Sequence, residues 1–371
     1  PSVDHPKHGK AMQYSADIQQ LLKQPPEGVK VFSRDYHSQS MEPAALEPEN
    51  GLAWYESAKG VMHMVGATQA PYATAGHMVG MVKASRFALN EMDYLSAFTV
   101  GYGQKAHHSF PYYVALAALY AEGRPVRLAL DRWQHFQFAL KRHPFDLKTT
   151  IAVDAAGQFQ AFSVDMRGDG GGTMNFSPSV GTLGVASSQS VYYFPKSDLS
   201  VAVYPSSEVT AGSVRGYGTL QSMAPTEMLV DEIADQLGMD AIALRQKNML
   251  RTGLRNTQGA VPAGHLRIGE ILALAAKDPV WTNRAKHKAE YEAANPGMRY
   301  GVGFASVQKS FGTAGEAALA LIEISPEGKI SMKHIAPEIG TGSSTAQMLV
   351  AQPFLGRPVD DVVFAAQKWP E

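Results

Sequence analysis

Three glycine-rich turns are the segments of this sequence whose residues could bind a ligand. They read Thr99-Val-Gly-Tyr-Gly-Gln-Lys105, Gly212-Ser-Val-Arg-Gly-Tyr-Gly218 and Gly340-Thr-Gly-Ser-Ser-Thr345. Glycine lets the backbone come close to a ligand, and amides at the start of a helix bind phosphate through their aligned dipoles. Together the three turns could hold a large phosphorylated cofactor. Taken singly, each is a weak signal, because most glycine turns only reverse the chain.

Other catalytic signatures are absent from the sequence. It contains no Gly-x-Gly-x-x-Gly after a strand-like run, no phosphate loop ending in Gly-Lys-Ser/Thr and no His-Glu-x-x-His. His107 and His108 are adjacent, so they cannot share one face of a helix as metal ligands, and His135 and His143 lie too far apart for one helical turn. We therefore expect these histidines to be core or surface residues.

Composition limits the classes of function. The 371 residues suffice for two domains, and a net charge of −1 gives no basis for binding nucleic acid. No window approaches the roughly 18 apolar residues that a membrane helix needs. The sequence has no cysteine, which excludes disulfides, iron–sulfur ligation and covalent haem attachment. Any electrons handled here must leave through a cofactor or another chain.

Alternating and continuous apolar runs predict strands, and capping signals predict helices between them. A helix over residues 110–122 ends at Gly123, a second follows Pro225 and runs to Leu237, and Asp240 can cap a third over residues 241–250. This mixture indicates an α+β fold with mixed sheets and helices packed on them. The strand-like runs are Val61–Gly66, Phe159–Met166, Leu199–Tyr204, Leu319–Ile324 and Ile330–Ile335.

Composition shifts suggest three parts of the chain. Residues 1–30 are polar and interrupted by proline, which favours a linker or the tail of a missing segment. The Gly- and Pro-containing stretch over residues 251–264 marks a boundary between a first domain, 31–252, and the N-terminal part of a second, 253–371. The sequence begins without a methionine or signal peptide, so we expect it to lie inside a longer precursor.

A series of short segments runs in one order along residues 30 to 371. These segments are Tyr36-His-Ser-Gln-Ser-Met-Glu-Pro43, Ala67-Thr-Gln-Ala-Pro71, Val100-Gly-Tyr-Gly-Gln-Lys105, Gly123-Arg-Pro-Val-Arg127, Leu130-Asp-Arg132, Lys141-Arg-His-Pro-Phe145, Val214-Arg-Gly-Tyr-Gly218, Glu227, Arg245-Gln-Lys-Asn248 and Glu338-Ile-Gly-Thr-Gly-Ser-Ser-Thr345. The series resembles the molybdopterin-binding subunit of the xanthine oxidase family, the molybdenum hydroxylases. That resemblance implies two mixed α/β cofactor-binding domains, the second incomplete here.

The resemblance also implies roles for individual residues. Molybdenum would be held by molybdopterin, as the cytosine dinucleotide, without direct side-chain ligands. Gln69 would hydrogen-bond an oxo ligand of the metal, Arg215 would line the metal site as the second catalytic residue, and Tyr217 would place its ring against the substrate. The other cofactor-binding residues would be Tyr102, Gly103, Gln104, Ser213, Val214, Thr341, Gly342, Ser343, Ser344 and Thr345. An anionic dinucleotide requires such amide and hydroxyl donors.

The sequence departs from the family pattern at several positions. Gln104 replaces a family glycine, and Thr341 replaces a family glutamine. No arginine lies between residues 178 and 196, where the family's purine hydroxylases carry one, which argues against xanthine as substrate. The family's catalytic glutamate, in Gly-x-Gly-Glu, would follow beyond residue 371. We expect Glu316, in a similar turn upstream, to be a surface or strand-end residue, and Glu42 to have a structural hydrogen-bonding role.

The expected function is therefore that of part of a molybdenum hydroxylase. It would oxidise an aldehyde or an N-heteroaromatic compound with oxygen derived from water, and a carboxylate base on the remainder of the subunit would assist. Partner chains carrying a 2Fe-2S centre and FAD would accept the electrons, in the bacterial cytoplasm or alternatively the periplasm. The competing interpretation is a non-catalytic molybdopterin-binding or assembly module.

Overall fold

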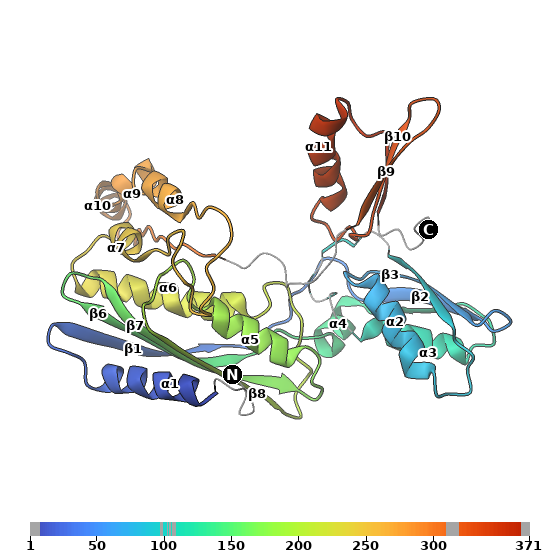
Figure 1. Ribbon diagram of the computed structural model, residues 1–371, viewed down its shortest axis with the longest axis horizontal. Coiled ribbons are helices and arrows are strands. Elements are labelled where there is room, and N and C mark those ends of the chain that lie inside the picture. The colour runs from blue at the N-terminus through green and yellow to red at the C-terminus, as the bar shows by residue number, and fades with distance from the viewer. Residues whose placement is uncertain are drawn as a thin grey trace.

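The computed structural model describes residues 8–96, 99–101, 103, 105, 109–308 and 319–364. Within these residues, mixed sheets carry helices on their faces (Figure 1), which confirms the predicted α+β class. None of the helices in this part of the chain combines the length and the apolar character that a membrane crossing requires.

The first sheet contains four strands in the order β1-β6-β7-β8. They are β1 (Val29–Ser38), β6 (Phe145–Asp154), β7 (Phe159–Gly171) and β8 (Ser197–Pro205). The β7–β8 pair is parallel and the other pairs are antiparallel. Helices α5 (Ser177–Ser187) and α6 (Thr219–Gln236) cover one face (Figure 1), where Ile151, Phe162 and Met166 are buried in the main core.

The linker expected over residues 1–30 is instead largely helical. Helix α1 (His8–Lys23) packs on the opposite face of the first sheet (Figure 1), against β7 and β8. Ile18, Leu21 and Leu22 lie on one side of this helix and cover Ala152 and Ala161 of the sheet. This apolar spacing stabilises the helix through tertiary packing, although its overall composition is polar.

A second sheet is inserted in the chain between β1 and β6. Its order is β4-β3-β2-β5, with β3 and β4 parallel. The strands are β2 (Asn50–Glu56), β3 (Val61–Gly66), β4 (Glu91–Ser96) and β5 (Val126–Ala129). Helices α2 (Pro71–Val82) and α3 (Phe110–Leu119) pack on it, around Met62, Met64 and Tyr94, and α4 (Arg132–Phe138) leads back to the first sheet. Residues 31–252 thus contain two sheets with separate cores.

Helix α6 begins seven residues earlier than predicted, at Thr219 and not at Thr226. We expected it to follow Pro225, but it starts at Thr219 and contains Pro225 within its first two turns. The first turns are buried, and the Ser222 hydroxyl donates to Gly184 O of α5 at 2.6 Å. This packing offsets the backbone hydrogen bond that proline removes. Helix α7 (Ala241–Asn248) starts as predicted, because the Asp240 carboxylate accepts from the amides of the first turn.

The last part of the chain packs in two places. Helix α8 (Ile268–Ala275) buries Ile268 and Leu272 in the main core. The packing of the first predicted domain therefore extends past residue 252, and the domain boundary at 252 stays a prediction. Helices α9 (Pro279–Thr282) and α10 (Arg284–Ala294) follow. Then β9 (Ala320–Ile324), β10 (Ile330–His334) and β11 (Asp361–Phe364) form a third sheet with α11 (Ser343–Leu355).

Candidate functional site

The turn over residues 99–105 is held from inside by a buried lysine. The Lys105 side chain is fully buried, and its ammonium donates to Glu47 O at 2.6 Å and Gly101 O at 2.8 Å. Burial lowers the pKa of Lys105, opposed by the nearby carboxylates. Gly101 has a φ of 87°, and a Cβ there would lie 2.8 Å from Leu46 N, so only glycine fits. The turn is therefore rigid in its described residues.

Gln69 lies directly beside this turn. It follows β3 and precedes α2, and its amide donates to Lys105 O at 3.0 Å. The Thr68 hydroxyl accepts from the Ala70 amide at 3.1 Å, which fixes the backbone on either side. The Gln69 side chain is exposed, so its amide group is not part of the core. The fixed backbone therefore holds the Gln69 side chain at the surface, where it does not take part in core packing.

The turn over residues 212–218 meets the first turn through one backbone hydrogen bond. The Arg215 amide donates to Gly103 O at 3.1 Å, and Arg142 Nη2 donates to Arg215 O at 2.7 Å. Ser213 and Val214 are buried, whereas Arg215 is exposed. The guanidinium of Arg215 therefore faces solvent from a backbone that is held on both sides.

Tyr217 is half-buried in a left-handed backbone conformation. Its φ is 52°, between Gly216 and Gly218, which also have positive φ. The ring packs against the main core, and burial raises the pKa of the phenol, although a hydrogen bond with Ser213 opposes this. A left-handed tyrosine is uncommon and indicates that the surrounding turn determines where the ring lies.

The third turn reaches the same place from the third sheet. The Thr99 amide donates to Glu338 O at 3.1 Å, and a Cβ on Gly340 would lie 3.3 Å from Thr99 O. Thr341, Gly342 and Thr345 are exposed, whereas Ser343 and Ser344 are half-buried. The two later turns and Gln69 therefore all contact the segment over residues 99–105, although Thr99 and Glu338 are 239 positions apart along the chain (338 − 99).

The structure thus brings together most of the residues singled out in the sequence. Tyr102, Gln104, Glu316, His107 and His108 lie outside the described residues. Lys105 and Glu338 were quoted as parts of motifs without a role, and their contacts show that they hold the turns in shape. The available signal for Glu338 was a carboxylate a few residues before the first turn of a helix.

Glu42 forms a buried ionic cluster near the site. Its carboxylate accepts from Lys141 Nζ at 2.7 Å and lies 3.2 Å from His135 Nδ1, and all three side chains are largely buried. Burial by itself would raise the pKa of Glu42, but the hydrogen bonds from His135 and Lys141 outweigh it and lower the pKa. This cluster supports the structural role expected for Glu42 and places His135 in the core, as predicted.

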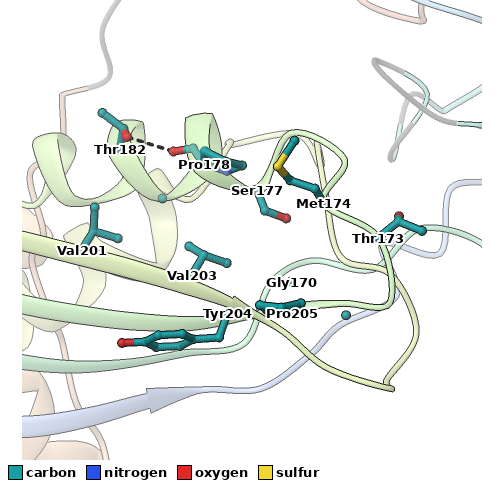
Figure 2. Close-up of a pocket in the computed structure, with 12 residues that line it drawn as sticks. Gly170, Thr173, Met174, Ser177, Pro178, Thr182, Val201, Val203, Tyr204 and Pro205 are labelled. Carbon is teal, nitrogen blue, oxygen red and sulfur yellow. Dashed lines mark hydrogen bonds between the residues drawn. The ribbon is translucent and has the colours of Figure 1, made fainter. Parts of the chain in front are cut away.

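A cleft of about 380 Å³ lies between α5 and the strands β7 and β8. Val201 and Val203 project from β8 toward the helix, and Met174 and Pro178 lie opposite (Figure 2). Of the residues predicted to bind cofactor or substrate, none that the structure describes lines this cleft. It is therefore a separate feature of the fold. Ser177, one of its lining residues, is buried, and the Ser177 hydroxyl is 2.8 Å from His143 Nε2.

His143 should make stability depend on pH. The ring is fully buried, and this burial lowers the pKa of His143 from 6.5 to about 4, although Asp169 opposes the shift. The unfolded chain then binds more protons between these values, so stability should rise with pH across that window, by about 1.4 kcal/mol per unit. Urea denaturation at several pH values measures this slope.

Two variants test whether His143 causes this dependence of stability on pH. His143→Gln should flatten the slope between about pH 4 and 6.5, because an amide does not titrate there. His265→Gln, at an exposed ring, should leave the profile close to that of the unaltered chain. An unchanged slope in His143→Gln would show that other groups produce it.

Comparison with known proteins identifies the family. A family model described as the molybdopterin cofactor-binding domain matches residues 5–249, and a second with the same description matches residues 275–368. The chain belongs to the molybdopterin cofactor-binding family. Its relatives confirm the resemblance to the xanthine oxidase family that the motif series indicated.

Two relatives and one solved structure illustrate the match. This chain is 26% identical over 329 residues to a xanthine dehydrogenase of Emericella nidulans. The match covers 85% of this chain and 23% of that protein. It is 30% identical over 235 residues to an aldehyde oxidoreductase of Megalodesulfovibrio gigas, covering 62% and 25%. The structure of quinoline 2-oxidoreductase from Pseudomonas putida 86 superposes with a TM-score of 0.76 at 22% identity, covering 90% and 44%. This chain spans about a quarter of the length of these two relatives.

Proposed function

We propose that this chain is the central part of the molybdenum-binding subunit of a hydroxylase that acts on aldehydes or N-heteroaromatic compounds. The observation that carries the proposal is that the two later glycine turns and Gln69 all contact the first glycine turn, residues 99–105. The links are Gln69 to Lys105, Arg215 to Gly103 and Thr99 to Glu338. A single large ligand could contact all of these segments at once, because the hydrogen bonds hold them together.

The donor chemistry of this region fits a molybdopterin dinucleotide. Gln69 supplies an exposed neutral amide, Arg215 an exposed cation, and Thr341 and Thr345 exposed hydroxyls. An anionic cofactor that is rich in oxygen requires donors of these kinds. At Gly340, a Cβ would approach Thr99 O within 3.3 Å, so glycine lets the first and third turns meet. We infer that Ser213, Val214 and the residues 341–345 border the cofactor, which is the cytosine dinucleotide form.

The residues of this chain would bind the cofactor and orient the substrate beside it, because the cofactor carries the reactive centre. When bound, the molybdenum cofactor supplies the transfer of an oxygen from water to an electron-poor carbon, with release of two electrons and two protons. Gln69 would donate from its neutral side-chain amide to an oxygen at the centre. Arg215 would favour negative charge there, and the Tyr217 ring would border the substrate. The carboxylate base and the iron–sulfur and FAD partners belong to other segments or chains.

The complete complex should contain molybdenum and pterin in about equal amounts, near one of each per copy of this chain. Metal analysis by mass spectrometry, together with oxidative release and fluorescence of the pterin, measures both. A complex that assembles with all its partners and holds neither would overturn the proposal. Full cofactor content without oxidation of any aldehyde or N-heteroaromatic substrate would favour the non-catalytic binding module instead.

A further inference from the structure

One carboxylate in the third turn already occupies several hydrogen-bond donors of that turn. Glu338 Oε1 accepts from the amides of Gly340 at 2.9 Å and Gly342 at 3.0 Å. Its Oε2 accepts from the Ser343 hydroxyl at 3.1 Å and the Ser344 amide at 3.3 Å. Glu338 is only 8% exposed, so this carboxylate is directed into the turn and not into solvent. Its four partners all lie within six residues of it.

These donors are those that a phosphate group would otherwise use. Ser344 is in the first turn of α11, and Gly342 precedes that helix in a left-handed conformation with a φ of 69°. The first amides of a helix have no backbone acceptor within it and attract anions. Here an anion that is part of the chain, the Glu338 carboxylate, accepts from the Ser344 amide and from the Gly342 amide just before the helix. A phosphate at the same amides would have to displace Glu338 and would be repelled by its charge.

Glu338 also joins this turn to the first one. Its own carbonyl accepts from the Thr99 amide at 3.1 Å, while its side chain holds the residues that follow. His334 Nε2 lies 3.2 Å from the Ser344 hydroxyl, so the half-buried serines are bonded within the protein as well. Thr341 and Thr345 of the same turn are exposed.

We propose that Glu338 is a positioning residue that forms the third turn before the cofactor binds. In this arrangement Glu338 replaces a ligand phosphate at Gly342 and Ser344. A cofactor phosphate therefore cannot use these two amides while Glu338 holds them. This inference rests on the proposed function for the identity of the ligand, but the order that Glu338 imposes on the turn can be measured without it.

The test compares Glu338→Ala and the nearly isosteric Glu338→Gln in the complete complex, before and after removal of the cofactor. Hydrogen exchange followed by mass spectrometry reports on the amides of residues 340–344. In Glu338→Ala the amides of Gly340, Gly342 and Ser344 should exchange at least about tenfold faster, because their acceptor is gone. Glu338→Gln, which keeps one oxygen, should show a smaller increase. Cofactor release during dialysis should also be about tenfold faster in Glu338→Ala, as is common when a supporting contact is removed.

Controls separate this inference from the proposed function. Glu323→Ala, in an exposed ion pair with Lys333 of the same sheet, should change neither readout. In the unaltered complex, removal of the cofactor should leave the amides of Gly342 and Ser344 protected. If that removal alone exposes them, or if Glu338→Ala exchanges and releases cofactor at the unaltered rate, Glu338 does not position the turn. A complex that never contains pterin would overturn the proposed function instead, whatever the exchange shows.

Discussion

Replacing Arg245 with methionine is expected to reduce the free energy of unfolding by about 3–5 kcal/mol. Arg245 is fully buried, and its guanidinium donates to Glu227 Oε2 through Nη2 at 2.9 Å and Nε at 3.0 Å. Without it, the Glu227 carboxylate stays in the core with the Tyr192 hydroxyl and the Ser306 amide as partners. Those neutral donors do not offset the cost of a buried charge.

Guanidinium denaturation measures this loss in the free energy of unfolding, and two further variants test its cause. Arg167→Met removes an exposed arginine that pairs with Asp165 at 3.1 Å on the first sheet, and should cost less than about 1 kcal/mol. The double change Glu227→Leu with Arg245→Met should recover part of the loss, because no charge is then left alone in the core. A loss for Arg245→Met no larger than that of the surface variant would contradict the buried-pair explanation.

The cluster around Arg245 also supports the site from a distance. Glu227 lies on α6, the helix that begins at Thr219 immediately after the second glycine turn. The Ser306 amide donates to the same carboxylate at 2.8 Å, which ties the segment before the third sheet to this helix. Breaking the cluster should therefore disturb the turn that carries Arg215, as well as overall stability.

Replacing Gln69 with alanine is expected to slow turnover of the complete complex by about 10- to 1000-fold at equal molybdenum content. The side chain is exposed beside the first turn and its backbone is fixed through Lys105, so the change removes one oriented polar contact without opening the core. The melting temperature should consequently stay within the error of the measurement. Single-turnover reduction by an aldehyde or N-heteroaromatic substrate gives the rate.

Gln24→Ala serves as the matched control, because this exposed glutamine directly follows α1, the helix that packs on the first sheet in a different part of the fold. It should retain the full rate. Loss of molybdenum in Gln69→Ala would show that the residue holds the cofactor as a whole. Full cofactor content with an unchanged rate would remove Gln69 from the site.

Secondary structure was predictable wherever it depends only on residues that are close in sequence. The strand at residues 61–66 was predicted to the residue, and Asp240 was identified as the cap of α7. Alternation of side chains and short-range capping depend only on neighbouring residues, so one sequence contains them. The order of short motifs likewise indicated the family, because it depends on the chain and not on its folding.

The tertiary structure alone decided where those elements meet. Helix α1 forms because Ala152 and Ala161 accept its apolar side, and α6 continues through Pro225 because α5 packs on its first turns. Neither partner is near in sequence. The same holds for the site: the composition of each glycine turn suggested binding, but only the fold shows that Lys105 and Glu338 hold those turns and that residues 99–105 join them. Such contacts depend on long-range packing and on which buried donor finds an acceptor, and no local pattern contains that information.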